Sequence, residues 1–321
     1  MTFPNPHFVE TNGLRMAVYE QGGGVPVVLC HGFPELAFSW RHQLPALAEA
    51  GFRAIAPDQR GYGATGGPKG RAAVPLYDMP HLTGDLVGLL DALQLDKAVF
   101  CGHDWGGLVV WQMALMHPAR VAGVIGVNTP FLPRPPGDPI ERFRQSFGDD
   151  MYIVRFQRWG EAEAVLDADI ARSMRFWYRK NRMTLAEYDR LPAERKNLAL
   201  LDVFQAPEER WSAPLVMSET ELAVYIQAFE RSGYEGGINW YRNFTRNWAM
   251  SAGLVQRIKV PCLMISAADD VVLRPEMAHG MEDHIPDLEK HVIADCGHWT
   301  QSEQPEALNR LMVDWLERRF G

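Results

Sequence analysis

A short segment, residues 102–106 (Gly-His-Asp-Trp-Gly), places a side chain that can act as a nucleophile between two glycines. The spacing Gly-x-nucleophile-x-Gly is typical of a sharp strand-to-helix turn that lifts the central side chain, here Asp104, above a sheet. The glycines suit this turn because it leaves no room for Cβ atoms beside the nucleophile. Residues 63–67 and 233–237 have similar glycine spacing, but only residues 102–106 follow a strand-like apolar run and precede an apolar helical pattern. Taken alone, the motif still favours an ordinary helix N-cap aspartate.

A second segment favours a nucleophile over a cap. Residues 31–34 (His-Gly-Phe-Pro) follow the apolar run that ends at Cys30. Backbone N–H groups at such a turn, and those directly after a nucleophile, can stabilise the oxyanion that develops during hydrolysis. We therefore expect the N–H groups of Phe33 and Trp105 to form an oxyanion hole.

The other members of a hydrolytic triad follow later strands. Asp269 and Asp270 come after the apolar run 260–266, and position alone does not decide between them. His298 follows the expected strand 288–293 and precedes the last helical segment. Nucleophile, acid and histidine therefore occur in one of the chain orders known for hydrolytic triads.

His298 is one of ten histidines, and its placement singles it out. His31 and His103 also lie at strand ends and are its rivals. A hydrogen-bonded structural role is the ordinary interpretation of any single histidine. The position of His298 relative to the other members favours it as the general base.

Apolar runs and amphipathic stretches alternate along the chain, which indicates how these residues are brought together. Compact apolar runs that end at turn-forming residues predict buried parallel strands, and apolar residues at helical spacing predict packed helices. The alternation predicts an α/β fold with a mainly parallel sheet and helices on both faces. The expected strands are 25–30, 53–56, 98–101, 121–127, 260–266 and 288–293, and the expected helices are 78–94, 105–117, a segment near 275–281 and a helix after Thr300.

The alternation is interrupted in the middle of the chain. Five prolines crowd residues 130–139, and the sequence that follows is mostly helical up to about residue 250. We expect one α/β core, residues 1–130 and 253–321, split by a helical cap domain, residues 131–252. At the start of the last helix, Thr300-x-x-Glu303 predicts a capping box.

The composition excludes several classes of protein. Hydrophobic residues make up 47% and charged residues 22% of the chain, as in an ordinary globular protein. The net charge of −8 argues against a nucleic-acid partner, and no apolar run is long enough to span a membrane. The N-terminus has no basic start or apolar segment, which predicts a cytoplasmic protein rather than a secreted one. The four widely separated cysteines favour neither a disulfide framework nor a zinc site, and neither a metal nor an organic cofactor is expected.

Four motifs together resemble a known family. They are residues 31–35 (His-Gly-Phe-Pro-Glu), 102–107 (Gly-His-Asp-Trp-Gly-Gly), 239–243 (Asn-Trp-Tyr-Arg-Asn) and 295–299 (Asp-Cys-Gly-His-Trp). Each is weak alone, but in combination the chain resembles the α/β-hydrolase superfamily and, within it, the soluble-type epoxide hydrolases, over nearly its whole length. The resemblance implies an α/β-hydrolase core with a helical cap, Asp104 as nucleophile, His298 as base and Asp270 as the partner of His298.

The resemblance also implies two cap tyrosines that bind the epoxide oxygen. Tyr241 matches through its Trp-Tyr-Arg-Asn setting, and Tyr152 matches less closely through Tyr-x-x-x-Phe-Gln. Either tyrosine can instead be a core aromatic of the cap with its hydroxyl at a surface. We also expect Phe33, Trp105 and Trp299 to contact the substrate.

An aspartate at the elbow changes the chemistry that a serine would perform. Aspartate is already ionised at neutral pH, so Asp104 can attack a saturated carbon directly and form an alkyl ester. His298 then activates water to attack the ester carbonyl. An epoxide opens to an alkoxide, which gains from a hydrogen bond, and neutral tyrosines can donate one.

Three hypotheses follow. The first is an epoxide hydrolase that converts apolar epoxides and water to vicinal diols. The second is a haloalkane or haloacid dehalogenase with the same nucleophile, although dehalogenases often have asparagine where this chain has Phe33. The third is a ligand-binding module without turnover, which has no need of His298 and Asp270 together. Neither nucleic acid nor membrane is an expected partner, and a homodimer is left open.

Overall fold

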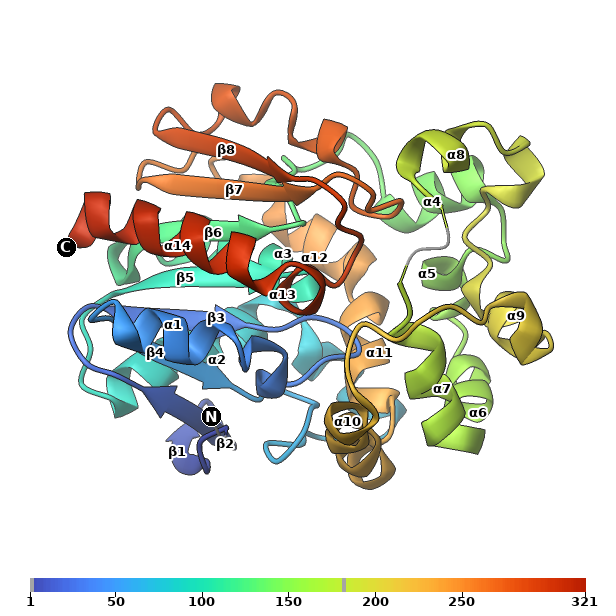
Figure 1. The fold of residues 1–321 in the computed structure, drawn as a ribbon, viewed down its shortest axis with the longest axis horizontal. Helices are drawn as coiled ribbons and strands as arrows, with labels where there is room; N and C mark the ends of the chain where they lie inside the picture. The colour runs from blue at the N-terminus through green and yellow to red at the C-terminus, as the bar shows by residue number, and fades with distance from the viewer. Residues whose placement is uncertain (1–2, 181–182) are drawn as a thin grey trace.

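A single sheet runs through the middle of the molecule (Figure 1). The structure, a computed structural model, describes residues 3–180 and 183–321, and in these ranges it has an eight-stranded sheet of order β1-β2-β4-β3-β5-β6-β7-β8. β1 and β2 are antiparallel to their neighbours, and the remaining strands are parallel. The strands are β1 His7–Thr11, β2 Leu14–Gln21, β3 Pro26–Cys30, β4 Arg53–Pro57, β5 Ala98–His103, β6 Val121–Val127, β7 Cys262–Ala267 and β8 Leu288–Ile293.

The central strands are buried on both faces because helices cover the sheet from both sides. α1 (Gln43–Glu49) and α14 (Pro305–Phe320) pack against one face, and α2 (Met79–Ala92) and α3 (Trp105–Met116) pack against the other. Every residue of β5 and β7 is buried, which explains their continuous apolar runs. The predicted α/β-hydrolase fold is thereby confirmed.

Several local predictions were incomplete or wrong. β1 and β2 were not expected from the sequence because they are partly exposed at the sheet edge, and β1 alternates in burial. The helix expected near residues 275–281 is instead two short 3-10 turns, Pro275–Ala278 and Met281–Asp283. Each is too short to form an α-helix, and a positive-φ glycine, Gly280, precedes the second turn.

The predicted capping box is also wrong. Trp299, not Thr300, precedes α13 (Thr300–Glu303), and the Thr300 hydroxyl donates to the side-chain oxygen of Asn128 over 2.6 Å. The Glu303 carboxylate accepts from the N–H groups of Trp299 and Gly297, over 2.9 and 3.1 Å. A tertiary hydrogen bond thus replaces the local one, and it anchors the loop that carries His298.

A helical insert connects β6 to β7. Most of its helices lie together at one side of the molecule, beyond the carboxyl ends of the strands (Figure 1), whereas α11 and α12 return to the core. Among the described residues, no helix has the length and apolar character that a membrane span requires. The helices are α4 Pro139–Phe147, α5 Tyr152–Arg155, α6 Glu161–Leu166, α7 Ile170–Trp177, α8 Leu185–Asp189, α9 Leu200–Gln205, α10 Glu219–Ser232, α11 Glu235–Arg242 and α12 Phe244–Met250.

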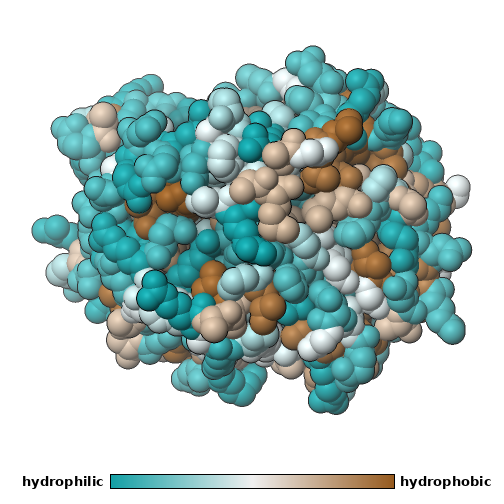
Figure 2. Space-filling view, turned by 180° about the vertical axis from the view of Figure 1, so that it is seen from behind, coloured by the Kyte–Doolittle hydropathy of each residue, from teal (hydrophilic) through white to brown (hydrophobic). Residues whose placement is uncertain are grey.

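The face of the molecule shown in Figure 2 is mostly hydrophilic. Figure 2 shows the face opposite to that of Figure 1, on which charged and polar residues surround separate hydrophobic patches. The four cysteines (Cys30, Cys101, Cys262 and Cys296) are buried and form no disulfide. The hydrophobic interior therefore holds the fold together without a covalent cross-link.

Candidate active site

Asp104 lies on the sharp turn between β5 and α3. Its backbone has φ 50° and ψ −121°, a strained conformation for a residue other than glycine. The flanking glycines make the turn possible, because a Cβ on Gly102 would overlap the carbonyl group of Gly106, and one on Gly106 would overlap that of Cys30. Asp104 occupies the N-cap position of α3, but its side chain makes no capping hydrogen bond. The side chain is thus free for another task.

The two carboxylate oxygens of Asp104 have different surroundings. Oδ1 accepts a hydrogen bond from the backbone N–H of Phe33 over 2.8 Å. Oδ2 lies 3.8 Å from Nε2 of His298, which is longer than a hydrogen bond. The amide of Trp105 is the first of α3, where helical N–H groups have no partner within the helix. The structure therefore brings Asp104, His298 and both predicted oxyanion-hole positions together.

Asp270 supports His298 from the other side of the ring. Nδ1 of His298 lies 2.8 Å from Oδ2 of Asp270, so this nitrogen donates and Nε2 faces Asp104. The other oxygen of Asp270 accepts from the N–H groups of Val272 and Leu273, each over 2.9 Å. Asp269 points elsewhere and accepts from the backbone N–H of Leu185. The structure thus separates two residues that the sequence left equivalent.

Asn128 belongs to the site but was not expected from the sequence. Its side-chain N–H group donates to Asp270 over 2.8 Å, and to the backbone carbonyl of His298 over 3.3 Å. Asn128 directly follows β6, and a polar residue at the carboxyl end of a buried parallel strand was a signal that could have identified it.

Burial and charge set the protonation of these groups. Burial alone would raise the pKa of Asp270, but the charge and hydrogen bond of His298 outweigh it and hold that pKa well below its usual range. Burial also raises the pKa of Asp104, and His298 and His103 offset this only in part. For His298, burial would lower the pKa, yet the negative charges of Asp270 and Asp104 raise it to about 9. In the free protein His298 is therefore mainly protonated at neutral pH.

Neither rival histidine faces Asp104 as His298 does. His31 is buried and bonds to Gly32 and Gln59 through its ring nitrogens. His103 is also buried, and its ring nitrogens lie 2.6 Å from Glu35 and 2.7 Å from the backbone carbonyl of His298. Both rivals are fully engaged in hydrogen bonds, which leaves His298 as the candidate base.

The two predicted tyrosines come from different helices of the insert and meet near Asp104. Tyr152 begins α5 and Tyr241 lies in α11, and their ring centroids are 5.9 Å apart. Both side chains are buried, with 7% and 3% exposure. Burial, with the negative charge of Asp104 adding to it, raises the pKa of both hydroxyls above the usual value. Both tyrosines are therefore neutral hydrogen-bond donors.

Aromatic rings surround these tyrosines. The Tyr241 ring lies 5.2 Å from the Phe33 ring and 5.0 Å from the Trp105 ring, centroid to centroid. Trp299 lies 4.7 Å from the His298 ring, and its indole N–H donates to the carbonyl of Trp177 in the insert. The three residues expected to contact substrate therefore lie beside the tyrosines or the histidine.

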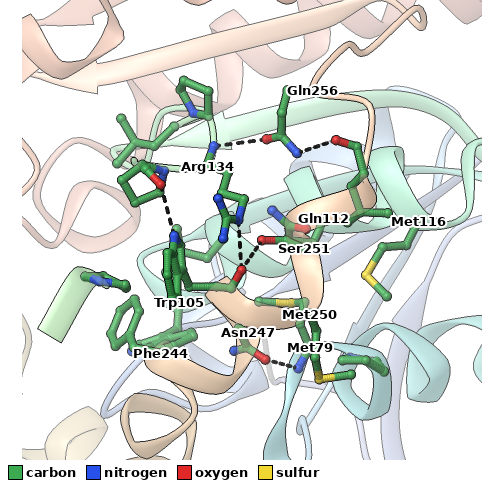
Figure 3. Close-up of a pocket in the computed structure, with 18 of the residues that line it drawn as sticks. Met79, Trp105, Gln112, Met116, Arg134, Phe244, Asn247, Met250, Ser251 and Gln256 are labelled. Carbon is green, nitrogen blue, oxygen red and sulfur yellow. Dashed lines mark hydrogen bonds between the residues drawn. The ribbon is translucent and has the colours of Figure 1, made fainter. Parts of the chain in front are cut away.

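Trp105, the residue after Asp104, lines a cavity of about 490 Å³ (Figure 3). The other residues of the site do not line this cavity: Asp104, Tyr152, Tyr241, Phe33, Trp299, Asp270 and His298. Its walls come from α2, α3, α12 and the proline-rich segment, with polar groups such as Gln112 and Asn247 among mainly apolar ones. Among the described residues, no group of three or more His, Cys, Asp or Glu side chains is arranged to hold a metal ion.

Comparisons with known proteins agree with this geometry. Residues 25–305 match the family model for the alpha/beta hydrolase fold. The chain is 43% identical over 328 residues to epoxide hydrolase A of Mycobacterium tuberculosis, covering 98% of both chains. It is 42% identical over 307 residues to bifunctional epoxide hydrolase 2 of Sus scrofa, and the match covers 95% of this chain but 54% of that protein.

The solved structures that are similar to this chain are also structures of epoxide hydrolases. The crystal structure of epoxide hydrolase A from Mycobacterium thermoresistibile matches with a TM-score of 0.85 at 41% identity, covering 98% of both chains. The chain spans about half the length of the mammalian relatives but nearly all of the mycobacterial ones. The chain therefore belongs to the α/β-hydrolase family and, within it, to the epoxide hydrolases.

Proposed function

We propose that this protein hydrolyses apolar epoxides to vicinal diols through a covalent ester on Asp104. The observation that carries the proposal is the difference between the two oxygens of the Asp104 carboxylate. Oδ1 is bound by the N–H of Phe33, while Oδ2 is beyond hydrogen-bond distance of His298. One oxygen is thus held and the other is free to attack.

In the first step, Oδ2 of Asp104 attacks a carbon of the epoxide and the bond from that carbon to the epoxide oxygen breaks. The oxygen takes a hydrogen bond and then a proton from Tyr152 or Tyr241, both of which are kept neutral by burial. The tyrosinate that results regains its proton from water. The product of this step is an alkyl ester whose carbonyl oxygen is Oδ1.

In the second step, His298 acts in its neutral form, which the ester favours because it removes the negative charge of Asp104. Its Nε2 takes a proton from a water molecule, which attacks the ester carbonyl carbon. Negative charge develops on Oδ1, where the N–H groups of Phe33 and Trp105 stabilise it. The tetrahedral intermediate collapses and releases the diol oxygen, which takes the proton from His298. The carboxyl group of Asp104 that results then loses its proton to the hydroxide that the tyrosinate left in the first step, so Asp104 is ionised again. Asp270 stabilises the protonated histidine between these events.

The cavity supports an apolar substrate. Its volume of about 490 Å³ and its mainly apolar lining are typical of a pocket for a small hydrophobic molecule. Trp105 connects the cavity to the reacting groups, because its ring lines the cavity and also contacts Tyr241. We therefore assign the cavity to the apolar part of the epoxide, and Phe33 and Trp299 to contacts nearer the reacting carbon.

The same proposal gives the insert its role. Residues 131–252 act as a cap domain that brings Tyr152 and Tyr241 over a core formed by residues 1–130 and 253–321. The hydrogen bond from Trp299 to Trp177 connects the two parts beside His298. A cytoplasmic location and a homodimer stay predictions.

A panel of epoxides of increasing apolar length, assayed for diol with the wild type and with Tyr241→Phe, tests the function. We expect the wild type to form diols, with a preference for apolar epoxides, and Tyr241→Phe to be much slower. Halide release from haloalkanes that is indifferent to both Tyr152→Phe and Tyr241→Phe would contradict the proposal and favour a dehalogenase. Measurable epoxide binding with no diol would favour a binding module.

A further inference from the structure

Gln112 is the one polar residue of α3. The sequence of this helix is Trp-Gly-Gly-Leu-Val-Val-Trp-Gln-Met-Ala-Leu-Met, so every other side chain on it is apolar or aromatic. A polar residue in an otherwise apolar helix breaks the local pattern, and breaks of this kind concentrate at functional sites. The proposed mechanism has no task for Gln112, although its helix begins directly after the nucleophile.

Gln112 lines the same cavity as Trp105. Four residues of α3 line this cavity, namely Trp105, Leu108, Gln112 and Met116. Their spacing of three and four residues places them on one face of the helix. At a rise of about 1.5 Å per residue, they extend over about 16 Å, and Gln112 lies about 10 Å along the helix from Trp105. The cavity therefore follows α3, with Trp105 at the end nearer to the reacting groups.

The amide of Gln112 differs from the other polar groups of the cavity because it has no partner. Asn247 accepts from the backbone N–H of Met79 over 2.8 Å, and Ser251 donates to the carbonyl of Trp248 over 3.0 Å. The amide of Gln112 makes no hydrogen bond to any residue that the structure describes (Figure 3). A wholly apolar occupant would displace the water that binds such an amide and would leave it unpaired, at a cost in free energy. Gln112 therefore points to an occupant that carries a polar atom.

The other charged and polar groups of the cavity decide which kind of polar atom fits. An amide both donates and accepts, so Gln112 alone leaves this open. Arg134 lines the cavity from the proline-rich segment, where its Nε donates to the carbonyl of Trp248 over 2.9 Å and its guanidinium lies 4.4 Å from the centre of the Trp248 ring. Its remaining N–H groups have no partner in the described part of the chain, and they only donate. No Asp or Glu is among the described residues that line the cavity, so the occupant should present an acceptor.

We propose that Gln112, with Arg134 as a second donor, selects epoxides that carry a hydrogen-bond-accepting oxygen about 10 Å along the chain from the reacting end. This inference deepens the proposed function and rests on it. In an extended chain about 10 Å corresponds to roughly eight bonds, at about 1.2 Å per bond. The substrate is then apolar next to the epoxide, where Trp105 and Leu108 line the cavity, and carries its oxygen further along, beside Gln112. Gln112 acts on which epoxide is bound and does not touch the reacting atoms.

A series of terminal epoxides of equal chain length, in which one ketone oxygen is moved stepwise along the chain, tests this inference. The kcat/KM for diol formation is measured for each ketone and for the all-carbon epoxide of the same length. With the wild type we expect a maximum where the ketone is roughly eight bonds from the epoxide. The maximum should exceed the all-carbon value by about 3- to 10-fold, the scale of one hydrogen bond.

The series distinguishes this inference from the function on which it rests. Diol formation without a maximum, or with a maximum beside the epoxide, would overturn the inference and leave the proposed function intact. No diol from any member of the series would overturn the proposed function and this inference with it.

Gln112→Met separates the hydrogen bond from the shape of the side chain. Methionine has nearly the same length as glutamine, is a good helix former and has no N–H group to donate. We expect the maximum to disappear and kcat/KM for the all-carbon epoxide to be unchanged or higher, which also shows that the variant is folded. A maximum that persists in Gln112→Met would overturn the role of Gln112.

Met116→Leu is the matched control, because it is a volume-conserving change on the same face of α3 and keeps the amide of Gln112. It should leave the preference for the ketone in place. A preference lost equally in Met116→Leu would mean that the shape of the cavity, and not the amide, selects the substrate. Arg134→Met should lower the maximum without moving it, and an unchanged maximum would remove Arg134 from the proposal.

Discussion

The site is built from two regions whose chemistry differs. The core supplies charged groups, Asp104, Asp270 and His298, each on a loop at the end of a parallel strand and held by backbone N–H groups or by another charge. The insert supplies neutral hydroxyls, Tyr152 and Tyr241, on helices and among other aromatic rings. Buried charges require such fixed partners, whereas a tyrosine only needs a dry environment to stay protonated. Substituting a charged residue of the core should therefore stop ester formation or ester hydrolysis, whereas substituting a tyrosine of the insert should only slow ester formation.

Asp104→Asn should have the largest effect. The amide cannot form the ester, so diol formation should fall by roughly 10⁴-fold or more, the scale seen when a nucleophile is removed. The asparagine tolerates the positive φ of this position and should leave the fold intact. Steady-state assays with an apolar epoxide measure the loss, and thermal unfolding controls for stability. Substantial activity in freshly prepared Asp104→Asn would contradict the account.

His298→Gln should separate the two chemical steps. Ester formation needs only Asp104 and the tyrosines, whereas ester hydrolysis needs the base, so turnover should fall by about 10²–10⁴-fold. Mixing the variant with one epoxide should give a protein mass increased by one substrate molecule, located on Asp104 by peptide mapping. A variant that loses ester formation along with turnover would show that His298 acts in the first step.

Tyr152→Phe and Tyr241→Phe should slow ester formation by about 10- to 100-fold each, because one donor remains, and the double variant by about 10²–10⁴-fold. Rapid mixing with an apolar epoxide measures this step. Tyr234→Phe is a matched control, since this buried cap tyrosine bonds to Ser173 over 2.7 Å and not to the reacting groups. An equal loss in Tyr234→Phe would indicate damage to the cap instead of a missing proton donor.

Ester hydrolysis should become faster as the pH rises. The base is neutral His298, whose pKa is raised to about 9 in the free protein, where the charges of Asp270 and Asp104 overcome the effect of burial. The ester removes the charge of Asp104, so the pKa of His298 in the ester should lie below about 9. The rate of ester decay should increase up to that pKa and then level off. A decay rate that falls as the pH rises between about pH 6 and 9 would rule out His298 as the base.

The sequence was most informative about the parallel strands. Asp104 and Asp270 follow strands that are buried throughout, and His298 follows the partly exposed edge strand β8. These strands were expected from the sequence, so the meeting of the three residues at one sheet edge was predictable. Features that depend on contacts between distant segments were missed. Thr300 bonds to Asn128 instead of capping its own helix, and neither this bond nor the role of Asn128 has a local sequence signal as strong as a motif.

The hydrogen bonds of His103 show the same limit. They join its ring to Glu35, 68 residues away, and to a backbone carbonyl 195 residues away. Residue types and spacing identified His103 only as a rival to His298, and the three-dimensional hydrogen-bond pattern was needed to show that its ring is bound elsewhere.

The covalent ester on Asp104 is the central claim, and a single turnover in water labelled with oxygen-18 tests it most directly. Because water attacks the carbonyl carbon of the ester, the label should enter the Asp104 carboxylate, and the first diol released should be unlabelled. Mass spectrometry of the peptide that contains Asp104 and of the diol measures both. Label in the diol of the first turnover, with none in Asp104, would mean that water attacks the epoxide directly and would contradict the account.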